Sequence, residues 1–517
     1  MPEPMRHPNT SPTIASNSGQ RFVERHRLWS DTQHAACGEV ERRIREEGLE
    51  LVRFAWADLH GVLRGKTLVA SAAISALRNG VNMVGTLLLK DSSHRTAYPV
   101  FQNNGEAPEG FGGAADVVMV PDPSTFKVLP WAESTGWVLC QAHFTNGQPI
   151  ELDPRHQARR ALQRLQERGM CLRTGLEVEF HIYRREGELP LPQDASWPGE
   201  APAVRLLHPG FNHLTEQWFD MAEPALRIVQ RTAQALDLPL TSLEIELGPS
   251  QVEAVFGPTD ALTSADHMVL FRSAVKQALH RAGYHATFMC RPPFPQVISS
   301  GWHLHQSLVD LNSGANLLIP EAPHPDPMEA ASLLSATGVH YLGGLLAHAR
   351  DMAAFASPTA NGYARYQGSV MAPQHVLWGR DNRGAMLRVI GQGPGDAATR
   401  IENRAGEPLA NPYLYLASQV HAGVRGLDQR LHPGRAADTP YAEDHATRLP
   451  ASLDEALSAL SAAVWLREDL GDAMVNHMVR VKRAELARLD QALAASDASA
   501  QAQARMDWDR REYFSVF

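Results

Sequence analysis

Residues 241–256 carry acidic side chains where a buried strand would ordinarily carry apolar ones. Apolar residues there alternate with Glu244 and Glu246, and a period of two places both glutamates on one face of a strand. A Gly-Pro pair then indicates a turn, after which Gln251 and Glu253 alternate with apolar residues in the same way. The stretch therefore predicts two neighbouring strands that present carboxylates on the same face.

The same alternation recurs in four other short segments, at residues 175–180, 301–308, 387–389 and 400–404. Segments that share this alternation are most simply interpreted as strands of a mostly antiparallel sheet. One face of such a sheet packs on helices, and the other lines a polar cavity. The polar residues predicted on the cavity face are Glu177, Glu179, His303, His305, Arg388, Glu402 and Arg404.

Several carboxylates on one cavity wall repel each other, so holding them ionised together requires compensating cations. Oxygen ligands with imidazole suit Mg²⁺ or Mn²⁺ better than Zn²⁺, and the four cysteines lack zinc-site spacing. Guanidinium groups match phosphate and carboxylate oxygens, so neighbouring arginines indicate phosphate handling. The arginines expected on this cationic side are Arg365, Arg383, Arg388, Arg400 and Arg404.

These ordered segments together resemble the glutamine synthetase family from about Glu50 to the end of the chain. Further matching segments are residues 361–365, which read Asn-Gly-Tyr-Ala-Arg, and residues 410–413, which read Ala-Asn-Pro-Tyr. The resemblance implies an α+β fold with a small N-terminal β-grasp domain at 34–147. A large catalytic domain at 148–517 would follow, with a curved, mainly antiparallel sheet backed by helices.

Helices and a tail are predicted from local patterns. Asp153 and Pro154 form a good N-cap pair for a helix that runs to about Arg168. Residues 1–33 are polar and proline-rich without periodicity, which predicts a disordered tail. Apolar residues at helical spacing predict further helices at 215–236, 265–282, 327–354 and 451–505.

The resemblance also implies two or three Mg²⁺ or Mn²⁺ ions in each site. One metal would gather the ATP phosphates and another would lie nearer the acyl substrate. The residues implied for the first metal are Glu177, His303 and Glu402. The residues implied for the second metal are Glu179, Glu246 and Glu253.

The substrates implied by the resemblance are ATP, L-glutamate and an amine. Catalytic roles are implied for Asp58, Arg365 and Arg404. Residues implied to bind the acyl substrate or the amine are Ser299, Gly301, Arg365, Met371, Arg388 and Arg404. Residues implied on the ATP side are His305, Ser307, Arg383 and Arg400.

Asp58 matches the family's carboxylate that assists the incoming amine, although on its own it is typical of a residue that begins a turn. In the family, the N-terminal domain closes the site of the neighbouring subunit. The resemblance therefore implies a homo-oligomeric ring, expected to be a dodecamer, whose active sites are shared between adjacent subunits.

Two positions depart from the family pattern. Met371 stands where ammonia-using members carry a glutamate that helps to hold ammonium. A thioether cannot neutralise a cation, but it packs well against an alkyl chain or an aromatic ring. Ser299 replaces a glycine whose backbone approaches bound glutamate, so the acyl pocket is expected to differ. Met371, with Trp302 as a further apolar wall, favours a hydrophobic amine over ammonia.

The predicted activity is that of an ATP-dependent ligase which joins the γ-carboxylate of glutamate to a hydrophobic amine through a γ-glutamyl phosphate. The amine is expected to be aryl, such as aniline, or small alkyl, as in γ-glutamylamide synthetases. A true glutamine synthetase and a polyamine or ethanolamine γ-glutamylating enzyme are the alternatives. A non-catalytic relative would have lost metal ligands, and all six are present.

Composition excludes other classes of function. A net charge of −9 argues against nucleic acid as a partner. The chain has no apolar run long enough to span a membrane and no signal-peptide pattern. Its four cysteines are scattered without motif spacing, which is typical of reduced thiols in a cytoplasmic protein.

Overall fold

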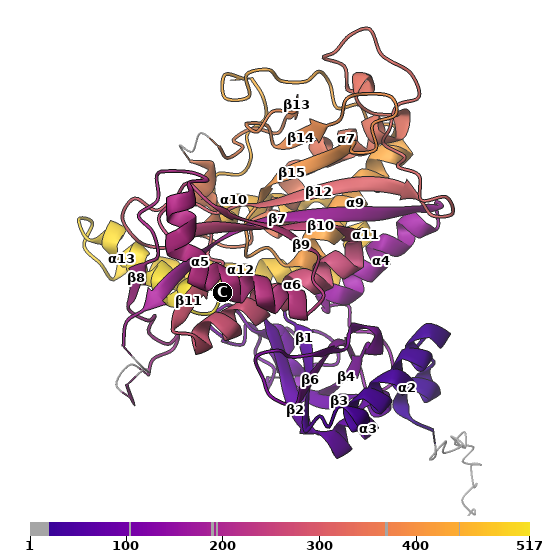
Figure 1. The fold of residues 1–517 in the computed structure, drawn as a ribbon, viewed down its shortest axis with the longest axis vertical. Helices are drawn as coiled ribbons and strands as arrows, with labels where there is room; N and C mark the ends of the chain where they lie inside the picture. The colour runs from indigo at the N-terminus through magenta and orange to yellow at the C-terminus, as the bar shows by residue number, and fades with distance from the viewer. Residues whose placement is uncertain (1–19, 103–104, 188–190, 193–194, 368–370, 444) are drawn as a thin grey trace, which may run out of the picture.

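The structure is a computed structural model that describes residues 20–102, 105–187, 191–192, 195–367, 371–443 and 445–517. It contains two β-sheets with helices packed against them, which confirms the predicted α+β class (Figure 1). In Figure 1 the sheet nearer the N-terminus lies below the larger one. Within the described part of the chain, no helix combines the length and the apolar character that crossing a membrane requires.

The sheet nearer the N-terminus has six strands in the order β2-β1-β6-β4-β3, with β5 paired to β6. Strands β1 and β6 are parallel, and the other pairs are antiparallel. Buried residues such as Phe54, Leu77 and Val138 give this part its own hydrophobic core. The strands are β1 (Leu51–Ala57), β2 (Leu63–Val69), β3 (Val81–Val84), β4 (Asp116–Pro121), β5 (Lys127–Val128) and β6 (Thr135–His143).

The predicted disordered tail is wrong for residues 20–33, while residues 1–19 lie outside the described residues. Helix α1 (Phe22–His26) is followed by α2 (Asp31–Glu46), and α3 (Ala70–Asn79) packs nearby. Val23 is fully buried, and the Trp29 indole donates a hydrogen bond of 3.1 Å to the carbonyl of Pro121. These two side chains belong to the core of the first sheet. Isolated anchors of this kind leave no periodic pattern in the sequence.

The larger sheet has nine strands in the order β13-β14-β15-β12-β7-β10-β9, with β8 and β11 also paired to β7. All pairs are antiparallel except β13 with β14, as the sequence predicted for a mainly antiparallel sheet. Its strands are β7 (Met170–Arg185), β8 (Val204–Leu206), β9 (Leu240–Ile245), β10 (Gln251–Asp260), β11 (Tyr284–Thr287), β12 (Trp302–Asp310), β13 (Trp378–Arg380), β14 (Leu387–Ile390) and β15 (Arg400–Gly406).

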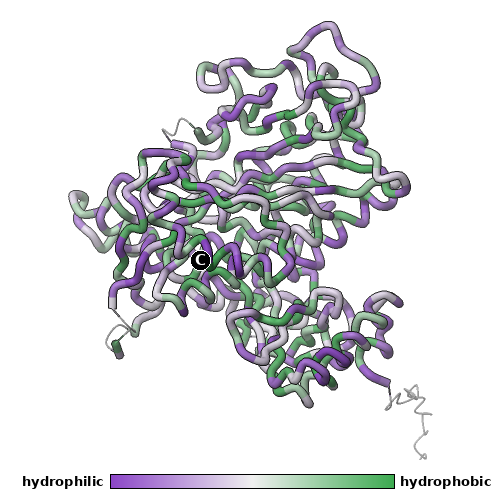
Figure 2. The backbone as a smooth tube through the Cα atoms, in the orientation of Figure 1, coloured by the Kyte–Doolittle hydropathy of each residue, from purple (hydrophilic) through white to green (hydrophobic). Residues whose placement is uncertain are grey.

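Helices cover one face of the larger sheet. Phe180 on β7 packs edge-to-face on Phe271 of α6, and hydrophobic and hydrophilic residues alternate along these strands (Figure 2). The predicted N-cap is confirmed, because the Asp153 carboxylate accepts a hydrogen bond from the backbone of His156 at the start of α4. The helices in this part are α4 (Pro154–Gln166), α5 (Glu216–Ala235), α6 (Ala261–Arg281), α7 (Ala336–Ala347), α8 (Ala349–Ala356) and α9 (Pro412–Gln429).

Two helix predictions need correction. The helix expected at 327–354 begins only at Ala336, where Ser335 caps α7, and a break at His348 separates α7 from α8. The helix expected at 451–505 is interrupted, and Gly471 at a φ of 96° marks one of the breaks. A positive φ suits glycine and ends a helix. The separate helices are α10 (Leu453–Ala462), α11 (Val464–Leu470), α12 (Asp472–Ala494) and α13 (Gln501–Asp509).

Candidate active site

The register of four central strands brings the predicted polar residues to one face of the larger sheet. Cross-strand partners have side chains on the same face. Glu253 on β10 pairs with Glu179 on β7, and Glu177 on β7 pairs with His303 on β12. On the other side of β12, His305 pairs with Glu402 on β15. The carboxylates and imidazoles therefore form one continuous wall, opposite the face that packs on the helices.

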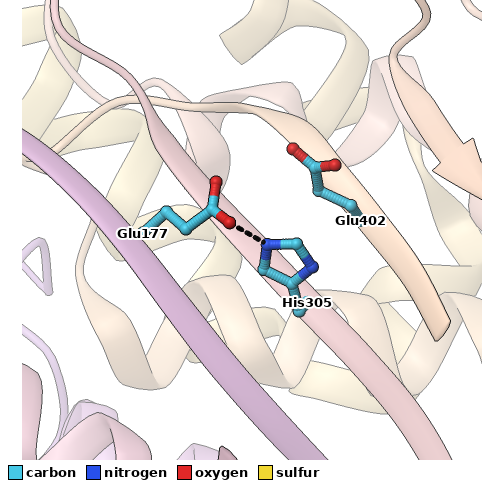
Figure 3. Close-up of side chains that lie close together, drawn as sticks. All are labelled: Glu177, His305 and Glu402. Carbon is cyan, nitrogen blue, oxygen red and sulfur yellow. Dashed lines mark hydrogen bonds and ion pairs between the residues drawn. The ribbon is translucent and has the colours of Figure 1, made fainter. Parts of the chain in front are cut away.

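The wall contains three groups of possible metal ligands, made up of six of its glutamates and histidines together with Glu246, which lies just after β9. Within each group, every residue offers one ligand atom, and these atoms lie within 4.8 Å of one another. Figure 3 shows the group in which His305 lies between carboxylates of neighbouring strands. The sequence placed His303 with Glu177 and Glu402, whereas the structure groups His305 with them. The groups are Glu177, His305 and Glu402; Glu177, Glu253 and His303; and Glu179, Glu246 and Glu253.

His303 has the features of a metal ligand. Its Nδ1 lies 3.1 Å from a Glu177 oxygen, and its buried Nε2 has no hydrogen-bond partner among the described residues. That Nε2 lies 3.7 Å from a Glu179 oxygen. Burial and the charge of Arg404 lower the pKa of His303, although the bond to Glu177 opposes this. A neutral imidazole with an unpartnered nitrogen facing carboxylates fits a divalent metal ion.

The negative charges of Glu253 and its neighbouring carboxylates are not balanced by nearby cationic side chains. Burial, followed by the charges of Glu179 and Glu246, raises the pKa of Glu253 to about 10. Burial also raises the pKa of Glu246, to about 6, and that of Glu179. Ionised carboxylates packed this closely require a cation between them. The donor set of oxygens with imidazole is the set expected for Mg²⁺ or Mn²⁺.

Arginines surround Glu402, which is fully buried on β15. Arg388 donates to one Glu402 oxygen at 2.8 Å, and Arg404 donates to the other. Arg365 donates to the carbonyl of Arg404 at 2.8 Å, so its guanidinium is held against the same strand. The Arg404 guanidinium also donates to the carbonyl of Arg383, whose own side chain is exposed. Four of the predicted arginines therefore line one side of the site.

On the side assigned to ATP, Arg400 donates to His305 Nδ1 at 3.1 Å. Because a guanidinium only donates, Nδ1 accepts this bond and the Nε2–H of His305 donates to Glu177 at 2.9 Å. Bonds from His303 and His305 outweigh burial and lower the pKa of Glu177. Ser307 donates to the carbonyl of Thr399 at 3.1 Å, which places it beside the strand that carries Arg400.

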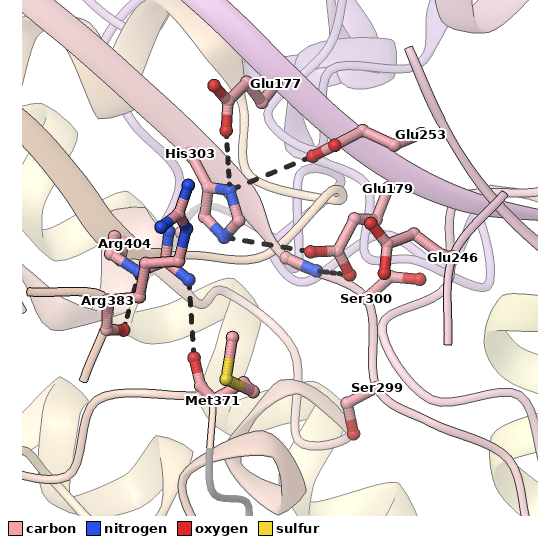
Figure 4. A network of polar contacts seen from close by, with 12 residues as sticks. Glu177, Glu179, Glu246, Glu253, Ser299, Ser300, His303, Met371, Arg383 and Arg404 are labelled. Carbon is pink, nitrogen blue, oxygen red and sulfur yellow. Dashed lines mark hydrogen bonds and ion pairs between the residues drawn. The ribbon is translucent and has the colours of Figure 1, made fainter. Parts of the chain in front are cut away.

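Gly301 is buried beside the carboxylates, and Met371 lies at the exposed mouth of the site. The Gly301 amide donates to Glu179 at 3.0 Å, and the Met371 carbonyl lies 3.5 Å from Arg404 Nη2. The Met371 side chain is 53% exposed, and Figure 4 shows it below Arg404 and across from Glu246. Ser299 is different, because its hydroxyl accepts a bond from Arg291 and lies apart from the carboxylates (Figure 4).

Asp58 is not brought together with the other predicted site residues within this one chain. One oxygen accepts hydrogen bonds from the backbone of His60 and Val62, and the other accepts from Arg64 at 2.7 Å. The residue is 2% exposed and stabilises the turn between β1 and β2. This geometry matches the turn role that the sequence left open, and the catalytic role of Asp58 stays a prediction.

Sequence reasoning gave no role in the site to three polar residues that lie in it. The Gln251 amide donates to Glu179 and to the Ser300 hydroxyl, each at 3.0 Å, and its alternation with Glu253 was the available signal. Asp381, in a loop, pairs with Arg388, and His213 lies 3.5 Å from Glu246. No periodic pattern marks either of these loop residues.

Comparisons with known proteins show what this chain is similar to. Residues 151–500 match the family model described as "Glutamine synthetase, catalytic domain". Gamma-glutamylanilide synthase from Acinetobacter sp is 38% identical over 504 residues, covering 96% of this chain and 99% of that protein. Gamma-glutamylethanolamide synthetase GlnA4 from Streptomyces coelicolor is 29% identical, covering 92% and 95%. The solved structure "Apo GmaS without ligand" has a TM-score of 0.71 and 28% identity, covering 87% of this chain and 96% of its own.

Proposed function

Because this chain belongs to the glutamine synthetase family of ATP-dependent carbon–nitrogen ligases, we propose that it joins the γ-carboxylate of L-glutamate to a hydrophobic primary amine. The amine is aryl, such as aniline, or small alkyl. The observation that carries this proposal is Met371 at the mouth of a site that otherwise keeps its full set of metal ligands. The name of the Acinetobacter relative, an anilide synthase, supports it.

In the proposed reaction the γ-phosphoryl group of ATP passes to the glutamate γ-carboxylate, giving γ-glutamyl phosphate and ADP. The amine then attacks the acyl carbon, and phosphate leaves as the amide forms. Arg365 and Arg404 are placed to stabilise the oxygens that carry the developing charge, since both guanidiniums lie along β15 beside the ligand wall. Arg388 holds Glu402 in position, and Arg383 stands at the exposed edge for the ATP phosphates.

The metal ions of the proposed site are Mg²⁺ or Mn²⁺, two or three per chain, held by the three groups around Glu177, His303 and Glu253. Such ions neutralise phosphate oxygens and the facing carboxylates when bound. His305 supports this arrangement, because it orients Glu177 and is itself held by Arg400. Gln251 and Gly301 orient Glu179 in the same way, through bonds to one of its oxygens.

The nature of the amine follows from protonation and packing. Aniline is neutral near pH 7 and needs no anionic site, whereas an alkylamine must lose a proton before it attacks. Met371 offers a polarisable apolar surface and no charge. The Streptomyces relative is named for an ethanolamide product, so a small polar amine is the second candidate. A preference for ammonia would identify the chain as a glutamine synthetase.

We further propose a cytoplasmic homo-oligomeric ring, a dodecamer, in which Asp58 of one subunit assists the amine bound by its neighbour. The ring that the resemblance to the glutamine synthetase family implies supports this, as does the separation of Asp58 from the site within one chain. In this assembly residues 34–147 form the domain that closes the adjacent site, and residues 148–517 form the catalytic domain. Sedimentation of the purified chain tests the ring.

The deciding experiment measures glutamate-dependent phosphate release from ATP with Mg²⁺ or Mn²⁺ across a panel of amines. The panel contains ammonia, ethylamine, isopropylamine, aniline, putrescine and ethanolamine. Greater stimulation by aniline or a small alkylamine than by ammonia supports the proposal. Preference for ammonia or ethanolamine would refute the proposal and identify the corresponding alternative. No stimulation of phosphate release by any amine would refute glutamate as the acyl substrate.

A further inference from the structure

A second cavity lies on the helix side of the larger sheet, away from the carboxylate wall. It has a volume of about 160 Å³ and is bounded by the turn at Gly61, by helix α6 and by the segment that ends at Phe517. Figure 1 shows α6 between the larger sheet and β1, which places this cavity where the two sheets meet. None of the residues assigned to the ATP, glutamate or metal sites lines it.

Two cationic side chains of α6, Arg272 and Lys276, line this cavity. Lys276 donates to the carbonyl of Ser515 at 3.0 Å. Arg272 donates to three carbonyls, those of Pro408 at 2.8 Å, Ala410 at 3.1 Å and Gly61 at 3.2 Å. These are bonds to neutral groups, and across the described parts of the chain neither cation forms an ion pair with a carboxylate.

The positive charge in this cavity is poorly compensated. Burial and the neighbouring Arg272 lower the pKa of Lys276 to about 7. Burial likewise lowers the pKa of Arg272 to about 10, although the charge of Asp58 opposes the shift. Asp58 is itself paired with Arg64. Two buried cations beside a cavity and without an acidic partner are stabilised by an anion that enters it.

The remaining walls are mostly apolar, with Val269, Phe288, Leu409 and Phe517 among them. An apolar cavity of roughly 150 Å³ accommodates benzene. The volume here is therefore sufficient for one benzene-sized group. Ser273 and Gln277 also line the cavity, but the Gln277 amide donates to the Ser273 hydroxyl at 2.9 Å. A phosphate with its several oxygens would therefore leave acceptors unpaired. The walls favour an anion with one charged end and an apolar body.

We propose that this cavity binds a small carboxylate with an apolar body of benzene size, whose carboxylate pairs with Lys276 and Arg272. The ligand would also lie against Gly61, in the turn that Asp58 stabilises. No residue assigned to ATP, glutamate or the metal ions lines this cavity, so the proposal does not depend on which amine the chain uses.

The test is calorimetric titration of the full chain with benzoate, with neutral benzamide and with inorganic phosphate. Benzoate is expected to bind, and benzamide is expected to bind at least about tenfold more weakly because it lacks the charge. Failure of benzoate to bind at millimolar concentration would overturn the proposal. Phosphate binding with affinity equal to that of benzoate would overturn the apolar part of the ligand assignment.

Variants locate the binding. Lys276→Met keeps the length of the side chain without its charge, and should weaken benzoate at least about tenfold. Lys276→Arg keeps the cation and should retain binding. The matched control is Lys66→Met, because exposed Lys66 also donates to a backbone carbonyl, that of Asn82, but lies outside the cavity. Benzoate affinity that is unchanged in Lys276→Met, with wild-type thermal unfolding, would place the ligand elsewhere and refute the site.

Discussion

The guanidinium of Arg365 occupies the space that a side chain at Gly301 would fill. A Cβ placed on Gly301 would lie 2.5 Å from Arg365 Nη2, well inside van der Waals contact. Arg365 cannot easily retreat, because its Nη1 donates to the carbonyls of Arg404 and Gly406 on β15. The glycine is thus required by close packing against a proposed catalytic arginine.

Gly301→Ala should therefore lower kcat/KM for glutamate by about tenfold to a hundredfold, since overpacking by one methyl group costs about 1–3 kcal/mol. Phosphate release at varied glutamate measures the effect. The matched control is Gly175→Ala on β7, where the nearest atom to an added Cβ is 3.4 Å away and contact is ordinary. Equal activity of the two variants would contradict the packing argument.

Two ligand glutamates should respond differently to neutralisation. Glu402 is paired with Arg388 and Arg404, and Arg388 also pairs with Asp381, so Glu402→Gln leaves buried Arg404 without a carboxylate partner. The variant should lose about 3–5 kcal/mol of stability as well as ATP turnover. Glu246 has no arginine partner among the described residues, so Glu246→Gln should lose turnover and keep its stability. Urea unfolding and phosphate release measure both. Substantial phosphate release by Glu402→Gln would refute its assignment as a metal ligand.

Gln251 should tune metal affinity without being a ligand, because its amide fixes one oxygen of Glu179. Gln251→Leu is expected to weaken Mn²⁺ binding by about 10- to 100-fold, as loss of a group that orients a ligand usually does. Calorimetric titration with Mn²⁺ measures this. The control is Gln230→Leu on α5, whose amide donates to Gln234. A Mn²⁺ affinity of the wild-type value in Gln251→Leu would show that the amide is dispensable.

Glu407 should make stability depend on pH. Burial raises its pKa from 4.5 to about 7, although bonds from Thr359 oppose the shift. The folded chain holds this proton to higher pH than the unfolded chain does, so stability falls as pH rises between these values. The expected loss is about 3 kcal/mol. The free energy of unfolding, measured at several pH values, should fall less with rising pH in Glu407→Gln than in the wild type. Parallel plots of this free energy against pH would contradict the prediction.

Met371→Glu tests what selects the amine. A carboxylate at this position would favour a cation and disfavour an aromatic ring, so the ratio of kcat/KM for ammonia to that for aniline should rise at least about tenfold. Met371→Leu keeps an apolar surface and should leave the ratio near the wild-type value. If the two variants have the same ratio of kcat/KM values, the side chain at position 371 does not select the amine.

The sequence by itself determined which side chains share a face. A strand has a period of two whatever surrounds it, so the positions of Glu177, Glu179 and Glu253 on the polar face could be read from local alternation. The same alternation predicted the mainly antiparallel sheet and placed Arg388 and Arg404 on the polar face, and a local capping pattern predicted the Asp153 cap. Each of these depends on residues close together in the chain.

Only the tertiary structure decided which of these residues meet. Whether His303 or His305 joins Glu402 depends on the register between strands far apart in the chain. Alternation excludes a slip of one residue, but it cannot distinguish registers that differ by two residues. The contact of Gly301 with Arg365 and the burial of Trp29 are likewise set by packing. The turn that holds Asp58 is positioned by the first sheet, so its distance from the site could not be read from its neighbours.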